Sequence, residues 1–133
     1  MKVAAALGLG LVLLAAGVTA WALESGSVLV LESVRPDGSA RATHVWFAER
    51  DRELWLEAAT PERAWLADLT RTPRVRVRRD EITRGYDAQP VPGEGPRRQV
   101  RAALRAKYGW RDAWVALFQD TSRAVAVRLR PAP

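Results

Sequence analysis

The stretch WLADLTRTPRV (Trp65–Val75) combines two kinds of local structure within a few residues. Trp65, Leu66 and Leu69 are spaced as they would be on one face of a helix. The residue before a proline is pushed away from helical backbone angles, so the helix is predicted to end just before Pro73. The Arg/Val alternation that follows is typical of a half-buried strand. The stretch therefore predicts a short helix that leads directly into a strand.

The rest of the chain predicts further short strands. They are expected, together with the strand that follows Pro73, at 27–34, 40–48, 53–59, 74–80, 81–91 and 122–130. The RPDGS sequence at 35–39 places Pro, Asp and Gly where a tight turn needs them. Consecutive strands joined by short turns form an antiparallel meander. The order of elements indicates a small, mainly antiparallel barrel closed by helices.

Helices are predicted at three places in this domain. Thr60 is expected to cap the first helix through its hydroxyl, with Pro61 at the first helical position, where a missing N–H costs nothing. A basic helix is expected to follow Pro96 and to end at Gly109, which suits a helix C-terminus. Its predicted buried face and the apolar face of the segment after Gly109 consist of Val100, Leu104, Tyr108, Trp110, Trp114, Leu117 and Phe118.

The N-terminal run 3–23 is apolar or small and carries no charge. As a helix it would span roughly 30 Å, the thickness of a bilayer core. It is longer than the core of a usual secretory signal, which favours a single-pass membrane anchor, although Lys2 and the small residues at 18–20 also fit a cleaved signal and a secreted protein. We therefore divide the chain into an anchor or signal segment, 1–24, and one domain, 25–133. The side of the membrane stays open.

Composition narrows the classes of function. The formal net charge is +6, and all but two of the 21 basic residues are Arg. Solvated faces account for this charge, and anionic lipid headgroups or a phosphorylated cofactor are alternatives. We expect no nucleic-acid partner, because the basic residues are interleaved with acids and form no known motif. The absence of cysteine excludes disulfides and thiolate metal sites, and no metal-ligand spacing, catalytic triad or phosphate loop is visible.

Two motifs carry a family resemblance. The Trp65–Val75 stretch resembles the W-Y-x-N-L-x-x-N-P-x-V run of the deazaflavin-dependent nitroreductase family, within the split β-barrel flavin-binding (pyridoxine-phosphate-oxidase-like) superfamily. The segment DGSARATHVWF (37–47) is similar to that family's G-x-x-R-x-x-P-x-W-F strand. The likeness extends over about residues 26–130. The chain departs from the pattern at RPDG, where the family has G-R-K-S-G, and at Asp68 and Thr72, where it has Asn.

The resemblance implies a fold and a function. The implied fold is mainly β (α+β), a small antiparallel split β-barrel with two to three short helices. The implied function is a nitroreductase- or quinone-reductase-like oxidoreductase that uses deazaflavin (coenzyme F420) or FMN, passes hydride to a small electrophile and forms a homodimer. The alternative is a non-catalytic, membrane-anchored module that binds a cofactor, haem or an anionic headgroup. No catalytic residue is assigned.

Candidate cofactor contacts follow from the same resemblance. Arg41, Thr43, Thr60 and Arg63 match positions that hold the cofactor phosphate, and the expected helix start at Thr60 is itself a ready anion site. The alternative interpretation is a plain helix cap and two surface arginines paired with acidic neighbours, Glu57 or Glu62.

Aromatic residues and the single histidine complete the candidate site. Trp46 and Trp65 are candidates for an apolar wall against the cofactor ring, with core packing as the alternative, and Trp55 is a weaker third. His44 is a candidate donor to a flavin carbonyl or a haem ligand. The alternative interpretation is that His44 is an ordinary exposed or hydrogen-bonded strand residue.

Overall fold

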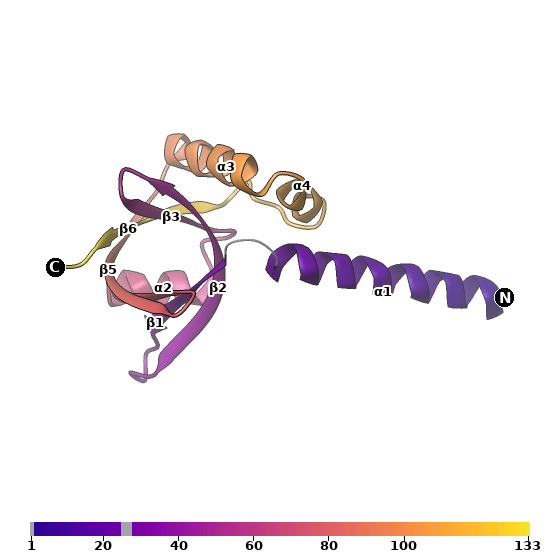
Figure 1. The fold of residues 1–133 in the computed structure, drawn as a ribbon, viewed down its shortest axis with the longest axis horizontal. Coiled ribbons are helices and arrows are strands. Elements are labelled where there is room, and N and C mark those ends of the chain that lie inside the picture. The colour runs from indigo at the N-terminus through magenta and orange to yellow at the C-terminus, as the bar shows by residue number, and fades with distance from the viewer. Residues whose placement is uncertain (1, 25–27) are drawn as a thin grey trace.

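The structure is a computed structural model that describes residues 2–24 and 28–133. Helix α1 (Lys2–Glu24) projects from a compact body that contains all the other elements (Figure 1). Apolar side chains along α1 are exposed, among them Leu7, Leu11 and Leu14. By length and hydropathy together, no helix within the described ranges qualifies to cross a membrane, so the predicted transmembrane segment at 3–23 is not supported.

The body is a closed barrel in which every strand pair is antiparallel. Around the barrel the strand order is β1-β2-β3-β6-β5-β4. The strands are β1 (Val28–Val34), β2 (Ala40–Arg50), β3 (Glu53–Ala58), β4 (Arg74–Arg79), β5 (Ile82–Val91) and β6 (Val125–Pro131). The predicted small antiparallel barrel is therefore confirmed, with strand ends displaced by only a few residues.

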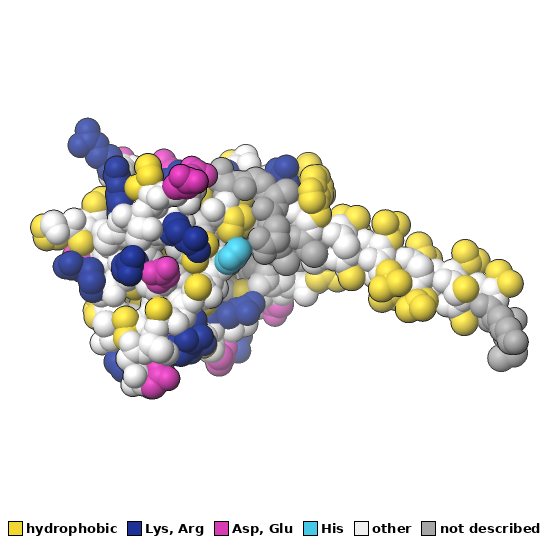
Figure 2. Space-filling view, turned by 60° about the horizontal axis from the view of Figure 1, so that its bottom comes forward, with side chains coloured by type: hydrophobic (Ala, Val, Ile, Leu, Met, Phe, Trp, Pro, Cys, Tyr) yellow, Lys and Arg dark blue, Asp and Glu magenta, His cyan; other side chains and the backbone are white. Residues whose placement is uncertain are grey.

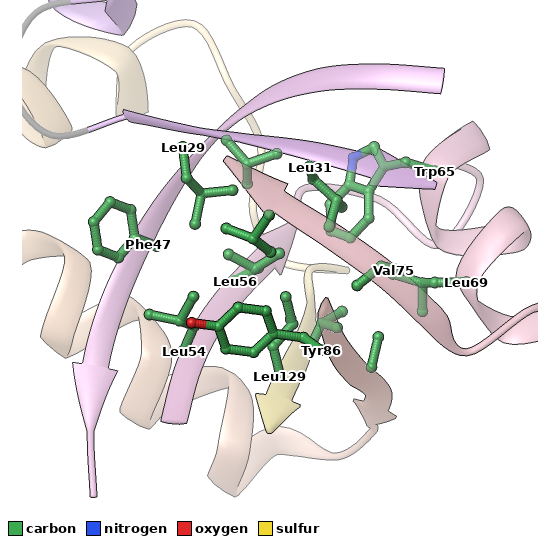
Figure 3. Packing of buried hydrophobic residues seen from close by; sticks show 14 of the residues in the cluster. Leu29, Leu31, Phe47, Leu54, Leu56, Trp65, Leu69, Val75, Tyr86 and Leu129 are labelled. Atoms are coloured by element: carbon green, nitrogen blue, oxygen red, sulfur yellow. The ribbon is translucent and has the colours of Figure 1, made fainter. Parts of the chain in front are cut away.

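Alternation along the strands fills the barrel interior. Val75 and Val77 of β4 are buried while the arginines between them are exposed, as the sequence predicts. Leu54 and Leu56 of β3 likewise point inward. Side chains from all six strands and from α2 meet in this core (Figure 3). Because inward- and outward-facing residues alternate along strands such as β1, β3 and β4, a shift of one residue would turn the apolar side chains outward, and the register is fixed.

The RPDGS turn forms as predicted. Arg35 N donates to Ser39 O at 2.8 Å, and Gly38 N donates to Arg35 O at 2.9 Å. Gly38 has φ +87°, a backbone angle that glycine adopts without steric cost. Asp37 Oδ1 accepts from Ser39 N at 2.9 Å, which fixes the turn further. This turn sets the register of β1 against β2.

Helix α2 (Ala64–Arg71) starts later than the sequence predicts. Its N-cap is Arg63, without a side-chain capping bond, so Thr60 is not the cap and Pro61 is not the first helical residue. The reason is local, because residues 60–63 form a separate turn in which Arg63 N donates to Thr60 O at 3.3 Å. The predicted end is correct, since α2 stops before Thr72, whose N–H donates to Asp68 O at 2.8 Å.

Of two further helices, α3 (Glu94–Tyr108) covers the outside of the barrel over β2, β3 and β6, and the second packs against α3 and α1 (Figure 1). Helix α3 buries Val100, Leu104 and Tyr108, as its spacing predicts. The Tyr108 hydroxyl accepts a hydrogen bond from Phe47 N at 3.1 Å, which ties the end of α3 to β2. Gly109 follows α3 at φ +57° and allows the chain to turn into α4 (Trp110–Ala116).

The predicted apolar face of the last helix is wrong. Helix α4 ends at Ala116, and it buries Asp112 and Val115 instead. Trp110, Leu117 and Phe118 are each more than half exposed. Trp110 stacks on Trp21 of α1 with ring centroids 5.4 Å apart. This contact between segments far apart in the sequence, which local periodicity cannot reveal, is one of those that hold α4 against α1.

Candidate functional site

A cavity of about 540 Å³ lies where α3, α4 and the turn before α2 meet strands β2 and β3. Five of the predicted site residues line it: Thr43, His44, Trp46, Arg63 and Trp65. Residues of α4 and Thr19 of α1 line one side of the cavity. Segments far apart in the sequence therefore converge on one space large enough for an aromatic ring system.

The contact between α1 and α4 is specific at this edge. Thr19 of α1 lines the cavity, and its hydroxyl accepts a hydrogen bond from Trp114 Nε1 at 2.9 Å. The same hydroxyl donates to Ala15 O at 2.7 Å. Thr19 thus uses both its hydrogen-bonding functions, and α1 contributes to the wall of the cavity.

The aromatic residues of the cavity divide between core and wall. Trp65 is only 6% exposed and packs in the barrel core beside Leu31 and Val75 (Figure 3), so the core interpretation is correct for it, yet it also reaches the cavity. Trp46 lies on the outer side of the barrel and stacks on Tyr108, with centroids 4.2 Å apart and planes 10° from parallel. Trp55 also packs on the outer side and does not line this cavity.

His44 is exposed, whereas Val45 beside it is buried, as strand alternation predicts. Figure 2 shows the imidazole at the surface of the barrel, with basic side chains on the same face. Its position at the cavity rim is compatible with contact to a bound molecule. Its proposed role as donor or haem ligand stays a prediction.

Arg41, in contrast, is engaged elsewhere. Its Nε lies 2.7 Å from Asp68 Oδ2, and Asp68 is only 2% exposed. Asp68 also accepts hydrogen bonds from Ser33 Oγ at 3.0 Å and from Arg71 Nη2 at 3.2 Å. Although burial by itself raises the pKa of Asp68, these bonds outweigh it and leave the pKa below its ordinary value. We call Ser33, Arg41, Asp68 and Arg71 the Asp68 cluster.

The predicted joint anion site of Arg41 and Arg63 is therefore not what the structure forms. Arg41 and Thr60 are not among the residues that line the cavity. Arg63 does line it, and no carboxylate in the described ranges forms an ion pair with Arg63. The acidic partners suggested by the sequence bind other arginines, since Glu62 pairs with Arg123 and Glu57 with Arg101. Among the described arginines of the cavity lining, Arg101 is paired with carboxylates, whereas Arg63 is available to an anionic group.

Three residues that the sequence interpretation missed also line the cavity: Glu57, Arg101 and Asp112. Arg101 Nη1 donates to Glu57 Oε1 at 2.6 Å, and Arg101 Nη2 donates to Asp112 Oδ1. The side chains of Glu57 and Asp112 are 9% and 3% exposed. The alternation of β3 places Glu57 on its outward face, which was the available signal. We call these three residues the Glu57 cluster.

The Glu57 cluster holds more acceptor atoms than it can satisfy. Among the described residues, nothing donates a hydrogen bond to Glu57 Oε2 or Asp112 Oδ2, although both atoms are buried. Burial raises the pKa of Glu57 above its ordinary value, the Arg101 guanidinium opposes this, and the charge of Asp112 adds to it. A buried acid with a shifted pKa in a cavity is a candidate for a functional group.

Comparison with known proteins identifies the family to which the chain belongs. The sequence model of the F420H(2)-dependent quinone reductase family matches residues 15–130. The chain therefore belongs to this family, and the resemblance to deazaflavin-dependent split barrels is confirmed. The cofactor prediction is also confirmed at the level of the family, whose description specifies the deazaflavin F420. A comparison with curated protein sequences gives no match.

Solved structures show the same fold. A conserved hypothetical protein from Mycobacterium tuberculosis is 22% identical, with a TM-score of 0.62 over 89% of this chain and 80% of that chain. A protein described as an F420 reductase is 19% identical, with a TM-score of 0.55 over 84% and 90%. A candidate pyridoxamine 5′-phosphate oxidase from Listeria innocua is 20% identical, with a TM-score of 0.60 over 90% and 94%. At these identities the likeness establishes the fold alone.

Proposed function

We propose that this chain is a deazaflavin-dependent oxidoreductase that reduces a quinone or a similar small electrophile in the described cavity. One observation carries the proposal, namely that the cavity combines tryptophan walls with an arginine available to an anionic group. Trp46 and Trp65 supply flat apolar surface, and Arg63 supplies the charge. The family assignment supports the cofactor class.

The residues present fit a phosphorylated deazaflavin. Arg63 and the Thr43 hydroxyl would bind its phosphate, because an arginine-phosphate contact is charge-assisted and strong. Trp46 and Trp65 would contact the ring, and His44 would reach its polar edge. When bound, F420H(2) supplies hydride, and the protein orients the acceptor and excludes water from the reacting atoms.

Binding of F420 by the full chain tests this assignment directly. Arg63→Gln is expected to weaken F420 affinity about tenfold, the equivalent of one charge-assisted bond of about 1.4 kcal/mol. Fluorescence titration of F420 measures the dissociation constant, and oxidation of F420H(2) by menadione measures turnover. Arg74→Gln is a matched control, since Arg74 is exposed, pairs with Asp87 across β4 and β5, and does not line the cavity.

The possible outcomes separate the functions considered. A chain that binds F420 without oxidising F420H(2) would indicate a binding module. A chain that binds haem and not F420, seen as a Soret band, would favour a haem protein with His44 as the candidate ligand. Equal F420 affinity in wild type and Arg63→Gln would remove Arg63 from the site.

We further propose that the exposed apolar side chains of α1 associate with lipid, which would bring the cavity close to lipid-soluble quinones. Exposed apolar surface of this kind is unusual in a monomeric soluble protein. Co-sedimentation of the full chain with phosphatidylcholine vesicles is expected to fall several-fold when Leu7, Leu11 and Leu14 are replaced by Glu. Equal sedimentation of both proteins would contradict the proposal. That the chain forms a homodimer stays a prediction, which is based on the family resemblance.

A further inference from the structure

The Glu57 cluster has an unusual balance of charge for a buried site. Two carboxylates accept hydrogen bonds from the same arginine, Arg101, and one oxygen of each is left without a hydrogen-bond donor. An ionised buried carboxylate without a full set of donors costs several kcal/mol, and a group in that position tends to take up a proton instead. The cluster therefore favours a state in which one of its two carboxyl groups is protonated.

The surroundings indicate which carboxyl group holds the proton. Asp112 Oδ2 has a second arginine nearby, because Arg105 Nε lies 3.9 Å away. Glu57 receives only a weak additional attraction from Arg97, which pairs with Glu94 instead. The charge of Asp112 also acts against ionisation of Glu57. Glu57 is therefore the group that more readily stays protonated.

Another basic side chain and the single histidine also line the cavity. Arg63 lies on the turn before α2, and His44 lies on β2. On the β6 side the backbone partner of Glu57 is Ala126, which carries no charge. Glu57 is thus the carboxyl group that β3 contributes to the cavity, and both of its neighbours of opposite charge lie on α3.

We propose that Glu57 is the proton donor of this cavity and protonates the reduced electron acceptor. The inference rests on the proposed function, in which hydride from the reduced deazaflavin adds to a quinone. The hydride, with its electron pair, forms one O–H bond on the quinone, both carbonyl π bonds are lost as the ring becomes aromatic, and a quinol monoanion with one C–O⁻ group remains. The O–H bond of Glu57 then breaks, its proton forms the second O–H bond of the quinol, and the Glu57 carboxylate regains a proton from solvent.

A purely structural role of the Glu57 cluster would give different experimental results. If the cluster only fixed α3 and α4 to the sheet, replacing Glu57 by its neutral isostere would change stability and leave the pH dependence of turnover intact. If Glu57 donates the proton, the same replacement removes the ionisation that limits turnover at high pH. The full chain therefore has to be compared in the variants Glu57→Gln, Glu57→Asp and Asp112→Asn.

The first readout needs no cofactor. Infrared spectra of wild type and Glu57→Gln are recorded in the carbonyl region across a pH titration. The difference between the two sets of spectra isolates the protonated form of the Glu57 carboxyl group. We expect that form to persist above the ordinary pH range of a glutamic acid, and Asp112→Asn to move its midpoint to lower pH by removing a like charge. A midpoint at or below the ordinary range would overturn the inference.

The second readout is the pH profile of menadione reduction by F420H(2). Loss of a positioned proton donor typically lowers the rate by about 10²–10⁴-fold, so Glu57→Gln is expected to lower kcat at least about 10²-fold with little change in KM. Asp112→Asn should keep the high-pH decline and shift it to lower pH. Glu57→Asp keeps an acid and should retain the decline if Glu57→Gln proves unstable.

The outcomes distinguish this inference from the proposed function. A wild type that turns over menadione while Glu57→Gln shows the same kcat and pH profile would overturn the inference alone. A wild type that binds F420H(2) but never oxidises it would overturn the proposed function and the inference together. A fall in kcat confined to Glu57→Gln, with the high-pH decline shifted in Asp112→Asn, would support both.

Discussion

The Asp68 cluster and the Glu57 cluster use the same chemical groups with opposite results. In the Asp68 cluster one buried carboxylate receives hydrogen bonds from two arginines and a serine. In the Glu57 cluster one arginine serves two buried carboxylates. The first has a surplus of donors and the second a surplus of acceptors. This difference explains why the pKa of Asp68 is lowered and that of Glu57 is raised.

The positions of the two clusters match their chemistry. The Asp68 cluster joins α2 to β1 and β2, and its ionised state is well satisfied by donors. The Glu57 cluster lines the cavity and leaves acceptor atoms unpaired. A satisfied ion cluster holds elements together, whereas an unsatisfied one has capacity left to exchange a proton with a ligand. The comparison therefore separates a structural cluster from a candidate chemical one.

The largest expected effect is loss of the central carboxylate of the Asp68 cluster. Asp68→Ala would leave Ser33 and Arg41 without their buried acceptor, and breaking a buried ion pair from one side typically costs about 3–5 kcal/mol. Because Arg41 retains partial exposure to solvent, we expect about 3 kcal/mol of lost unfolding free energy. Urea unfolding of the full chain, followed by tryptophan fluorescence, measures it.

An exposed ion pair provides the control for that experiment. Asp87 accepts from Arg74 Nε at 2.8 Å, but both side chains are at least half exposed. Surface pairs of this kind contribute about 0–1 kcal/mol, so Asp87→Ala should change stability little. If Asp68→Ala cost no more than Asp87→Ala, the Asp68 cluster would not be the structural element inferred here.

The fold was largely predictable from the sequence because its signals are local. Alternation in RVRVRR, the RPDGS turn and the proline after Thr72 each fix a strand, a turn or a helix end within a few residues. The start of α2 was not predictable from Thr60, since a Thr-Pro pair can precede a helix as an independent turn. The prediction of the buried face of α4 failed for another reason, because the orientation of α4 depends on contacts with α1.

The site was predicted only in part, because its interactions are long-range. Strand and family patterns pointed to residues on β2 and near the start of α2 that the structure places in the lining of the cavity. They could not show that Arg41 binds Asp68, 27 residues away, instead of facing the cavity. Nor could they join Glu57 to Arg101, 44 residues away, since that contact exists only once α3 lies over β3.

A smaller expected effect is the pH dependence of stability, which should differ in direction between Asp68 and Glu57. The ordinary pKa of an aspartate is 3.8 and that of a glutamate is 4.5. A carboxyl group with a lowered folded-state pKa stabilises the fold above its ordinary pKa and loses that contribution as the pH falls through the folded value. A carboxyl group with a raised pKa contributes below its ordinary value, and the contribution is lost as the pH rises through the folded value.

The two neutral isosteres should therefore respond to pH in opposite directions. The stability deficit of Asp68→Asn relative to wild type should be full at neutral pH and shrink as the pH falls below 3.8. The unfolding free energy of Glu57→Gln relative to wild type should instead increase as the pH rises above 4.5, because the substitution removes a buried group whose ionisation destabilises the fold. Urea unfolding across this pH range measures both differences in the same buffers. Parallel responses would mean that the surplus of acceptors in the Glu57 cluster is satisfied in solution, and Glu57 would then lack the protonated state on which its proposed role depends.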